Sequence, residues 1–507
     1  MKQLDYLLDR ITMYRLVLYY LILLILVAFL ISLFGFSSVN PWAIILTTVF
    51  ILSVSYVTNK VFSYVFKVPS NVESVYITAL ILACIITPIR SFNTGGIGFV
   101  FFAAVLAQAS KYILAIKGKH IFNPVAIAVI LTTVGLQQSA SWWIGNGLLT
   151  PFIIIGGLLI LRKTRREYMA VAFYTSSLIL ITFFGLINHS SLVILYTQVF
   201  LHSPFFFFAY IMLTEPLTSP TKQNFQIAYG FLVGLLFPPQ LHIFGLYSTP
   251  ELALIIGNIF SYFVSSKERF ILHLHSELRI APSIIDFIFK PQTKLKYAAG
   301  QYIEWTFSHP KTDSRGNRRY FTLSSSPTEE ALRIGVKFYE NGSSYKKNLS
   351  IIDKSMPIML TQLAGDFILP KDQDKKLVFI AGGIGITPFR SMLKFLIDTK
   401  DKRDIVTFFS NSLAEDIIYK DILEDAERTL STKTFYTLTN LDKIPTSWEG
   451  GKGRITSQMI MNNVPDWKER LFYLSGPHSM VTRFESELHK MGVQRTNIKK
   501  DFFPGFV

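Results

Sequence analysis

Ten apolar runs fill the chain from residue 14 to residue 265, and the remainder has the mixed composition of a soluble protein. A chain of 507 residues with 50 % hydrophobic content, divided in this way, is not expected to fold around one soluble core. Several runs are shorter than the ~20 residues of a straight crossing, which predicts half-helices that meet inside a membrane. Residues 1–265 are therefore expected to form an all-α polytopic domain with about ten transmembrane helices. The runs lie near 14–36, 41–57, 71–88, 97–116, 122–137, 148–161, 168–187, 192–212, 226–240 and 251–265.

Basic charge is distributed unevenly over the apolar part. Residues 1–269 carry 16 Lys and Arg against 7 acidic residues, and residues 270–507 carry 34 against 27, so net charges of +9 and +7 sum to the +16 of the chain. With ten crossings, fifteen of the sixteen basic residues fall on the side of the N-terminus and Arg90 alone falls on the other. The positive-inside rule then places both termini in the cytoplasm, which predicts a multi-pass protein of the cell (inner) membrane. The partner expected for this charge is anionic membrane lipid and not nucleic acid.

Cys84 is the single cysteine of the chain. One cysteine excludes a disulfide framework, and it excludes an iron–sulfur cluster held by cysteines of this chain alone. The first apolar run lacks the short apolar core and small-residue cleavage site of a signal peptide. It is therefore expected to be retained as a span.

The second part of the chain changes pattern at about residue 375. From 268 to 371, short strand-like runs follow one another, which predicts an antiparallel barrel. From 375 to 507, strand and helix patterns alternate, which predicts a parallel α/β domain. The expected strands are Ile271–Leu278, Ser283–Phe289, Gln301–Phe307, Tyr320–Ser324, Leu332–Phe338 and Ile358–Leu363, then Leu377–Ala381, Ile405–Ser410, Thr434–Leu438, Leu471–Ser475 and Ile498–Phe502.

Two motifs of the barrel region have the residues that a flavin nucleotide needs. In R-R-Y-F-T-L-S-S (Arg318–Ser325), an aromatic side chain can stack on the flavin ring, hydroxyls can bond it, and an arginine can clamp phosphate. In N-G-S-S-Y-K (Asn341–Lys346), small residues before a helical stretch expose backbone N–H groups to a phosphate. The residues expected to bind the cofactor are Arg319, Phe321, Thr322, Ser324, Gly342, Ser343 and Ser344.

Two further motifs lie in the α/β region. A-G-G-I-G-I-T-P (Ala381–Pro388) follows an apolar strand and opens a helix at Thr387, so its glycines allow close approach of a pyrophosphate. S-G-P-H-S-M (Ser475–Met480) follows a later strand. The residues expected to bind the nucleotide are Gly382, Gly383, Gly385, Thr387, Pro388, Gly476, Pro477 and Met480.

In this order, the four motifs resemble the ferredoxin–NADP⁺-reductase-type module over residues 268–507. The resemblance implies a Greek-key barrel that binds FAD and an α/β domain that binds NADH or NADPH. It also implies that Thr322 and Ser475 lie beside the reacting rings and that Phe503 of the tail approaches the flavin. This chain has Phe321 where the family usually has Tyr, and Ser475 where it commonly has Cys. Which nucleotide is used stays open, because no arginine accompanies Ser410 and Asn411 at the end of the second strand.

The apolar part carries H-I-F-N-P (His120–Pro124) and T-E-P-L-T-S-P-T (Thr214–Thr221). Over residues 15–265, these resemble motifs of the membrane protein family that Rnf electron-transport complexes share with Na⁺-translocating NADH:quinone reductase. The resemblance implies two inverted five-helix repeats and a membrane flavin, FMN or riboflavin. The family's S-G-A-T attachment sequence is absent, and Trp142 and Trp143 of the corresponding loop are expected to form an interfacial belt. The residues expected near such a flavin are Asn123, Thr150 (the only candidate for covalent attachment), Glu215 and Thr218.

Together these features predict a membrane-bound NAD(P)H oxidoreductase that passes electrons to an extracytoplasmic flavoprotein or a quinone. Other membrane subunits of such complexes are further candidate partners. One alternative is a haem-type ferric reductase or NAD(P)H oxidase, which places paired histidines about thirteen residues apart inside its helices. Haem is not expected, because only His189 and His202 have that spacing and His189 is expected in an outer turn (Asn188–Ser191). The other alternative is a transporter whose soluble head senses redox state.

Overall fold

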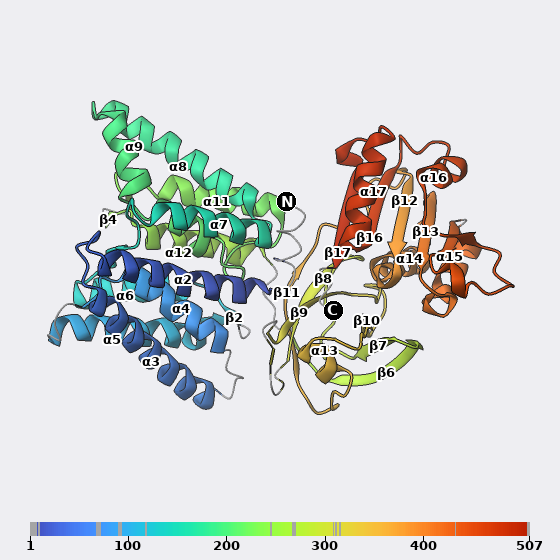
Figure 1. Cartoon of the computed structure of the whole chain (residues 1–507), viewed down its shortest axis with the longest axis horizontal. Helices are drawn as coiled ribbons and strands as arrows, with labels where there is room; N and C mark the ends of the chain where they lie inside the picture. The colour runs from blue at the N-terminus through green and yellow to red at the C-terminus, as the bar shows by residue number, and fades with distance from the viewer. Residues whose placement is uncertain are drawn as a thin grey trace. The chain divides into compact units, whose positions relative to one another are not determined.

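The computed structural model describes residues 8, 11–66, 72–89, 94–116, 119–243, 246–265, 270–307, 309, 312–313, 316–430 and 432–503 (Figure 1). The chain divides into two compact units, residues 1–269 and 270–507. Each unit is described by itself.

The first unit is helical at all ten predicted runs. Four helices are long and apolar enough to cross a membrane, namely α2, α3, the Gly96–Ile113 part of α5, and α8. A fifth crossing results if the bent pair formed by Leu192–Leu201 and Phe205–Met212 counts as one. Ten crossings therefore stay a prediction. The helices are α2 (Met13–Leu33), α3 (Pro41–Val65), α4 (Val72–Ile85), α5 (Thr94–Ile113), α6 (Pro124–Leu136), α7 (Thr150–Thr164), α8 (Glu167–Ile187), α9 (Leu192–Leu201), α10 (Phe205–Phe207) with the π-helical turn η1 (Phe208–Met212), α11 (Gln223–Leu236) and α12 (Pro250–Val264).

Two local features differ from the single unbroken spans expected from the sequence. The run 192–212 bends by 55° between α9 and α10, where Pro204 cannot continue a helix. Short hairpins, β1 (Ala115–Ile116) with β2 (Lys119–His120) and β3 (His242–Ile243) with β4 (Leu246–Tyr247), precede α6 and α12. Both of these helices start at a proline, which fits their first turn because proline lacks the N–H that would stay unpaired there.

Glycines allow α11 to pack closely on α8. A Cβ on Gly230 would lie 2.2 Å from the carbonyl oxygen of Met169, and a Cβ on Gly234 would lie 2.1 Å from Ser176 Oγ. Gly230 and Gly234 form a G-x-x-x-G pair, the spacing that lets apolar helices approach through their backbones. The α8–α11 contact therefore depends on the absence of side chains at these two positions.

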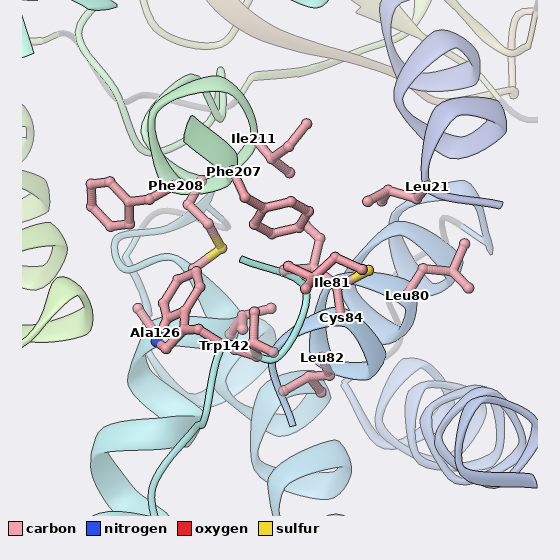
Figure 2. Close-up of a cluster of buried hydrophobic side chains, with 14 of the residues drawn as sticks. Leu21, Leu80, Ile81, Leu82, Cys84, Ala126, Trp142, Phe207, Phe208 and Ile211 are labelled. Carbon is pink, nitrogen blue, oxygen red and sulfur yellow. The ribbon is translucent and has the colours of Figure 1, made fainter. Parts of the chain in front are cut away.

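Trp142 lies in the interior of the helical unit, so its predicted place in an interfacial belt is wrong. The centroid of its ring lies 6.4 Å from that of Phe207 and 6.1 Å from that of Phe208, within the buried cluster of Figure 2. Its backbone N–H donates to the carbonyl of Ile85 at the end of α4 (2.8 Å), and its indole N–H donates to Glu251 of α12 (2.8 Å). An indole with a polar partner of this kind is stable in a core, which the sequence alone does not reveal.

The second unit combines antiparallel strands with a parallel sheet, as predicted. The antiparallel part has sheets ordered β10-β7-β6 and β5-β11-β8-β9, and the parallel sheet is ordered β15-β14-β13-β12-β16-β17. The short edge strand β15 was not predicted. The strands are β5 (Phe270–Leu272), β6 (Leu274–Ala281), β7 (Ile284–Phe289), β8 (Tyr302–Thr306), β9 (Arg318–Thr322), β10 (Leu332–Lys337), β11 (Ile358–Ala364), β12 (Leu377–Gly382), β13 (Ile405–Asn411), β14 (Lys433–Leu438), β15 (Gly451–Lys452), β16 (Leu471–Pro477) and β17 (Ile498–Phe503).

Helices connect and cover these strands. The central strand β12 is buried along its whole length, which explains its unbroken apolar sequence. The helices are α13 (Ser344–Leu349) in the barrel and α14 (Thr387–Thr399), α15 (Lys420–Leu430), α16 (Ser457–Asn463) and α17 (His478–Lys490) in the α/β part.

Replacement of Gly230 by leucine is expected to disrupt the helical unit, because the new side chain overlaps the backbone of α8. Overpacking of this kind costs about 1–3 kcal/mol or more. The Tm and size-exclusion profile of the detergent-purified protein measure the effect. Gly135→Leu is the matched control, since nothing lies within 4 Å of a Cβ at Gly135. An unchanged Tm for Gly230→Leu would contradict the packing described here.

Candidate active site

Strand β9 presents the predicted flavin residues toward α13. Arg319 and Phe321 alternate with Tyr320 along the strand and therefore lie on the same side of it. The guanidinium carbon of Arg319 lies 5.0 Å from the ring centroid of Tyr345, and the ring of Phe321 lies 6.1 Å from the same ring. Tyr320 is exposed and packs edge-on against Tyr302. The strand thus brings the arginine and the aromatic ring to the turn where the flavin phosphates are expected.

That turn has an acidic partner which the sequence analysis missed. The Ser344 N–H donates to the Asp313 carboxylate at 2.9 Å, and the Ser344 hydroxyl contacts His309 Nε2 at 3.0 Å. Ser343 is fully buried and caps α13 by accepting from the N–H of Lys346. Gly342 precedes it, and a Cβ there would lie 3.0 Å from the carbonyl oxygen of Tyr339. A pyrophosphate that bonds the Ser344 amide must therefore displace the Asp313 carboxylate.

The two residues predicted to lie beside the reacting rings have buried hydroxyls. Within the part of the chain that the structure describes, neither Thr322 Oγ1 nor Ser475 Oγ has a hydrogen-bond partner. Buried polar groups almost always have partners, so an unpartnered one calls for an explanation. A flavin and a nicotinamide supply acceptors and donors of the required kind, and these two positions therefore fit the cofactors.

The nucleotide loop runs from the end of β12 through the 3₁₀ turn η2 (Gly383–Ile386) into α14. Gly383 has φ +53° and open space beside it, as needed where a ligand approaches the backbone. A Cβ on Gly385 would lie 2.4 Å from the carbonyl oxygen of Ser475. The hydroxyl of Thr387 donates to the carbonyl of Ile384 at 3.1 Å and so stabilises the turn. Two of the predicted glycines are thus required by geometry, one by φ and one by close packing.

The β16 motif packs directly on this loop. A Cβ on Gly382 would lie 2.4 Å from Met480 Sδ and 3.2 Å from Pro477 Cδ, and a Cβ on Gly385 would lie 2.7 Å from Gly476 Cα. Pro388 occupies the first turn of α14, where proline is favoured. The structure therefore brings the two predicted nucleotide motifs together. The backbone of Phe503 on β17 pairs with Pro477 on β16, whereas the side chain of Phe503 lies outside the described residues.

Ser324 has a different environment from the other flavin-motif residues. It is fully buried, its hydroxyl lies 3.4 Å from Asp286 Oδ1, and its carbonyl oxygen accepts from Arg390 at 2.7 Å. Neither Asp286 nor Arg390 was singled out from the sequence. The sequence offers one signal for Arg390. This residue lies three positions after Thr387, in the first turn of α14, and a charged side chain there contacts the neighbouring antiparallel part.

The helical unit brings three of the four predicted membrane-site residues together. Glu215 Oε2 accepts from Asn123 Nδ2 at 2.8 Å and from Thr218 Oγ1 at 2.9 Å, while His120 Nε2 lies 3.4 Å from Glu215 Oε1. Thr150 is not among them, and its hydroxyl donates to the carbonyl of Asn146 at 2.9 Å. The group around this one carboxylate is called the Glu215 cluster below: His120, Asn123, Glu215 and Thr218.

Further buried groups that the sequence analysis missed surround the Glu215 cluster. Arg166 donates to the carbonyl of Thr214 at 3.0 Å, and Asn258 accepts from the backbone N–H of Asn123 at 2.8 Å. Polar residues within apolar helices are the signal that would have found them. The cavity beside Asn123 and Glu215 measures about 60 Å³, far below the roughly 300–1,000 Å³ of ligand pockets. A flavin ring enters only if this cavity widens.

The histidine pair with haem-like spacing does not face the interior. His189 lies in the turn after α8 and His202 follows α9, and both are exposed. Among the described residues, no group of three or more His, Cys, Asp or Glu side chains is arranged to hold a metal ion.

Comparisons with known proteins agree with this geometry in the C-terminal half. A family model described as "Oxidoreductase NAD-binding domain" matches residues 379–486. A flavohemoprotein of Oceanobacillus iheyensis is 26 % identical over 239 residues, which cover 45 % of this chain and 57 % of the relative. NADH-cytochrome b5 reductase 1 of Dictyostelium discoideum is 29 % identical over 186 residues, which cover 36 % of this chain and 63 % of the relative. The C-terminal unit is an NAD(P)H-dependent flavin oxidoreductase module.

This chain spans less than two thirds of the length of these relatives. A solved structure, the flavohem-like FAD/NAD-binding domain of nitric oxide dioxygenase from Vibrio cholerae O1 biovar El Tor, is 18 % identical with a TM-score of 0.41, covering 46 % of this chain and 98 % of that chain. The family match and the two sequence relatives confirm the predicted reductase module, whereas the resemblance of residues 15–265 to the Rnf and quinone-reductase membrane proteins stays a prediction.

Removal of either unpartnered hydroxyl is expected to slow the reaction without destabilising the fold. Thr322→Val and Ser475→Ala lose no protein hydrogen bond, so their Tm should equal that of the wild type or exceed it. The rate of flavin reduction by NADH should fall about tenfold, which corresponds to one hydrogen bond in the transition state. Anaerobic stopped-flow absorbance measures this rate.

Thr407→Val is the matched control, because Thr407 Oγ1 on β13 is also buried without a partner among the described residues. It should keep the wild-type rate. Wild-type rates for Thr322→Val and Ser475→Ala would exclude both hydroxyls from the reacting site.

Proposed function

We propose that the chain is a membrane-bound oxidoreductase that takes hydride from cytoplasmic NAD(P)H and passes electrons through its helical unit to an extracytoplasmic flavoprotein or a quinone. The observation that carries this proposal is one chain with a reductase module and a helical unit in which the partly buried carboxylate of Glu215 accepts hydrogen bonds from Asn123 and Thr218. When bound, FAD would supply the ability to accept a hydride and release single electrons.

In the reductase module, the residues act by binding and orientation. Arg319 and the turn at Ser343 and Ser344 would hold the flavin phosphates, and Phe321 would pack on its ring. The loop around Gly383 would hold the nucleotide pyrophosphate at the start of α14. Thr322 and Ser475 would hydrogen-bond the two rings where they meet, so that no side chain needs to act as a strong acid or base.

In the helical unit, we propose ten crossings arranged as two five-helix repeats, with both termini and the reductase module in the cytoplasm. The positive-inside charge distribution supports this topology. Helices α6 and α12, each preceded by a hairpin and started by a proline, support the internal repeat. The short helices match the discontinuous helices that line binding sites in membrane proteins with repeats.

We further propose that the Glu215 cluster marks the site of a second, non-covalent flavin. Ionisable residues within membrane segments are rare and usually functional, which supports this assignment. Covalent attachment at Thr150 is less favoured, because its hydroxyl is buried and bonded to a backbone carbonyl.

The flavin content of the anaerobically purified protein tests this assignment. We expect more than one flavin per wild-type chain, all bleached by NADH, and about one per chain in Glu215→Gln, because the amide cannot keep the charge and acceptor pattern of the cluster. Glu251→Gln is the control, since Glu251 is a buried carboxylate of the same unit bonded to Trp142. It should keep the wild-type flavin content.

Other outcomes would contradict the assignment in distinct ways. Loss of the second flavin in Thr150→Ala and not in Glu215→Gln would place it on Thr150. A single flavin in the wild type would leave the helical unit without one, and a haem band would favour the ferric-reductase alternative.

A further inference from the structure

Two consecutive residues of α14 hold two consecutive carbonyl groups of the flavin-binding segment. Arg390 donates to the carbonyl of Ser324 at 2.7 Å, and the hydroxyl of Ser391 donates to the carbonyl of Ser325 at 2.6 Å. Ser324 follows β9, which carries the flavin motif, and α14 starts at Thr387 of the nucleotide loop. The two cofactor sites are therefore joined by direct bonds between the segments that build them.

Arg390 is fixed by a charged partner on the barrel side. Its two terminal nitrogens donate to Glu329 at 2.6 and 3.0 Å, a bidentate pair of the strong, geometrically specific kind. Glu329 also accepts from the backbone N–H of Ser326 at 2.6 Å, so the carboxylate belongs to the same turn that Arg390 contacts. Only 4 % of the Arg390 surface is exposed, and water therefore screens the pair little.

The protonation state of Glu329 agrees with its role as the charged partner of Arg390. Burial alone would raise the pKa of Glu329, but the hydrogen bond and charge of Arg390 outweigh burial and hold the pKa below its ordinary value. The carboxylate is thus charged at neutral pH and keeps its ion pair with Arg390.

A second contact connects the same two parts of the module. The hydroxyl of Tyr419 donates to Asp286 Oδ1 at 3.1 Å, and Asp286 forms an ion pair with Arg333 at 2.6 Å. Tyr419 has φ +57°, a conformation that tyrosine rarely adopts. A Cβ on Gly335 of β10 would lie 2.6 Å from the Tyr419 hydroxyl and 3.2 Å from the Thr387 methyl. The nucleotide loop can therefore pack against the backbone of β10 only because Gly335 has no side chain.

We propose that Arg390 is a positioning residue for hydride transfer, which fixes the nucleotide loop relative to the flavin strand through Ser324 and Glu329. The proposal rests on the reductase function of the C-terminal unit and not on the function assigned to the helical unit. Its physical basis is that a displacement of about 1 Å between reacting groups can cost about 100-fold in rate. Tyr419, through Asp286, and Gly335, through Thr387, provide a second contact between the same two parts of the module.

The test compares Arg390→Met with Arg470→Met in the full-length, detergent-purified protein. Arg470 is a matched control because it is a buried arginine that donates in a bidentate manner to Asp404 at 2.7 and 2.8 Å, within the α/β part alone. Anaerobic stopped-flow absorbance gives the limiting rate of flavin reduction at saturating NADH, the apparent dissociation constant of NADH, and the long-wavelength charge-transfer absorbance of the reduced flavin–NAD⁺ pair.

We expect Arg390→Met to lower the limiting rate at least tenfold and to remove the charge-transfer absorbance, while the dissociation constant of NADH changes less than threefold. Arg390→Lys, which keeps the charge but not the bidentate geometry, should fall between Arg390→Met and the wild type. Arg470→Met should keep the wild-type limiting rate and charge-transfer absorbance, whatever its Tm.

An unchanged limiting rate in Arg390→Met, or an equal loss in Arg470→Met, would overturn the proposal. If Arg390→Met does not fold, Tyr419→Phe is measured instead, which removes one oxygen and should lower the limiting rate while the NADH dissociation constant is kept. A wild-type rate in Tyr419→Phe would then overturn the proposal. Failure of the wild type to reduce its flavin would contradict the reductase assignment itself and is distinguishable from these results.

Discussion

Hydride moves only between groups in van der Waals contact, and this constraint governs the arrangement of the C-terminal unit. The flavin strand and the nucleotide loop belong to separate sheets, so their relative position depends on contacts between the sheets. Those contacts include the bonds from Arg390 and Ser391 to the segment after β9, the bond from Tyr419 to Asp286, and the contact of the nucleotide loop with Gly335. The buried hydroxyls of Thr322 and Ser475 have no partner among the described residues, and we propose that the flavin and nicotinamide rings supply those partners.

The helical unit is stabilised by different means. Close backbone contact at Gly230 and Gly234 joins α8 to α11, and hydrogen bonds of buried polar residues join the two halves of the unit. In the membrane proposed for this unit, the hydrophobic effect does not drive helices together, so small residues and polar bonds would determine which helices associate. The Glu215 cluster lies at such a junction, because Asn123 at the start of α6 bonds both Glu215 and Asn258.

Most of the fold and part of the site are predictable from sequence because the signals are local. Each of the ten apolar runs is helical in the described residues, and strand patterns located the longer strands. The expected strand Ile271–Leu278 is wrong, because this segment is divided between β5 and β6, which belong to different sheets. The bend at Pro204 was missed because the run 192–212 is long enough for one crossing, and β15 was missed because a two-residue strand has no periodicity. The glycine and hydroxyl motifs were found because each is contiguous along the chain and packs as a unit.

The rest of the site depends on pairs that are distant in sequence. Arg390 and Glu329 are 61 residues apart, and Tyr419 and Asp286 are 133 residues apart, so no spacing rule connects them. Likewise, Asp313 reaches the Ser344 amide from 31 residues away. Trp142 was misplaced for the same reason, since its partner Glu251 is 109 residues along the chain.

The central claim is that electrons from NADH leave the reductase module through the helical unit, and proteoliposomes with trapped ferricyanide test it most directly. NADH added outside reaches only chains whose reductase module faces outward. The account predicts that the trapped ferricyanide is then reduced, at a rate that Arg390→Met lowers. Full bleaching of the flavin by NADH with no reduction of the trapped ferricyanide would contradict it.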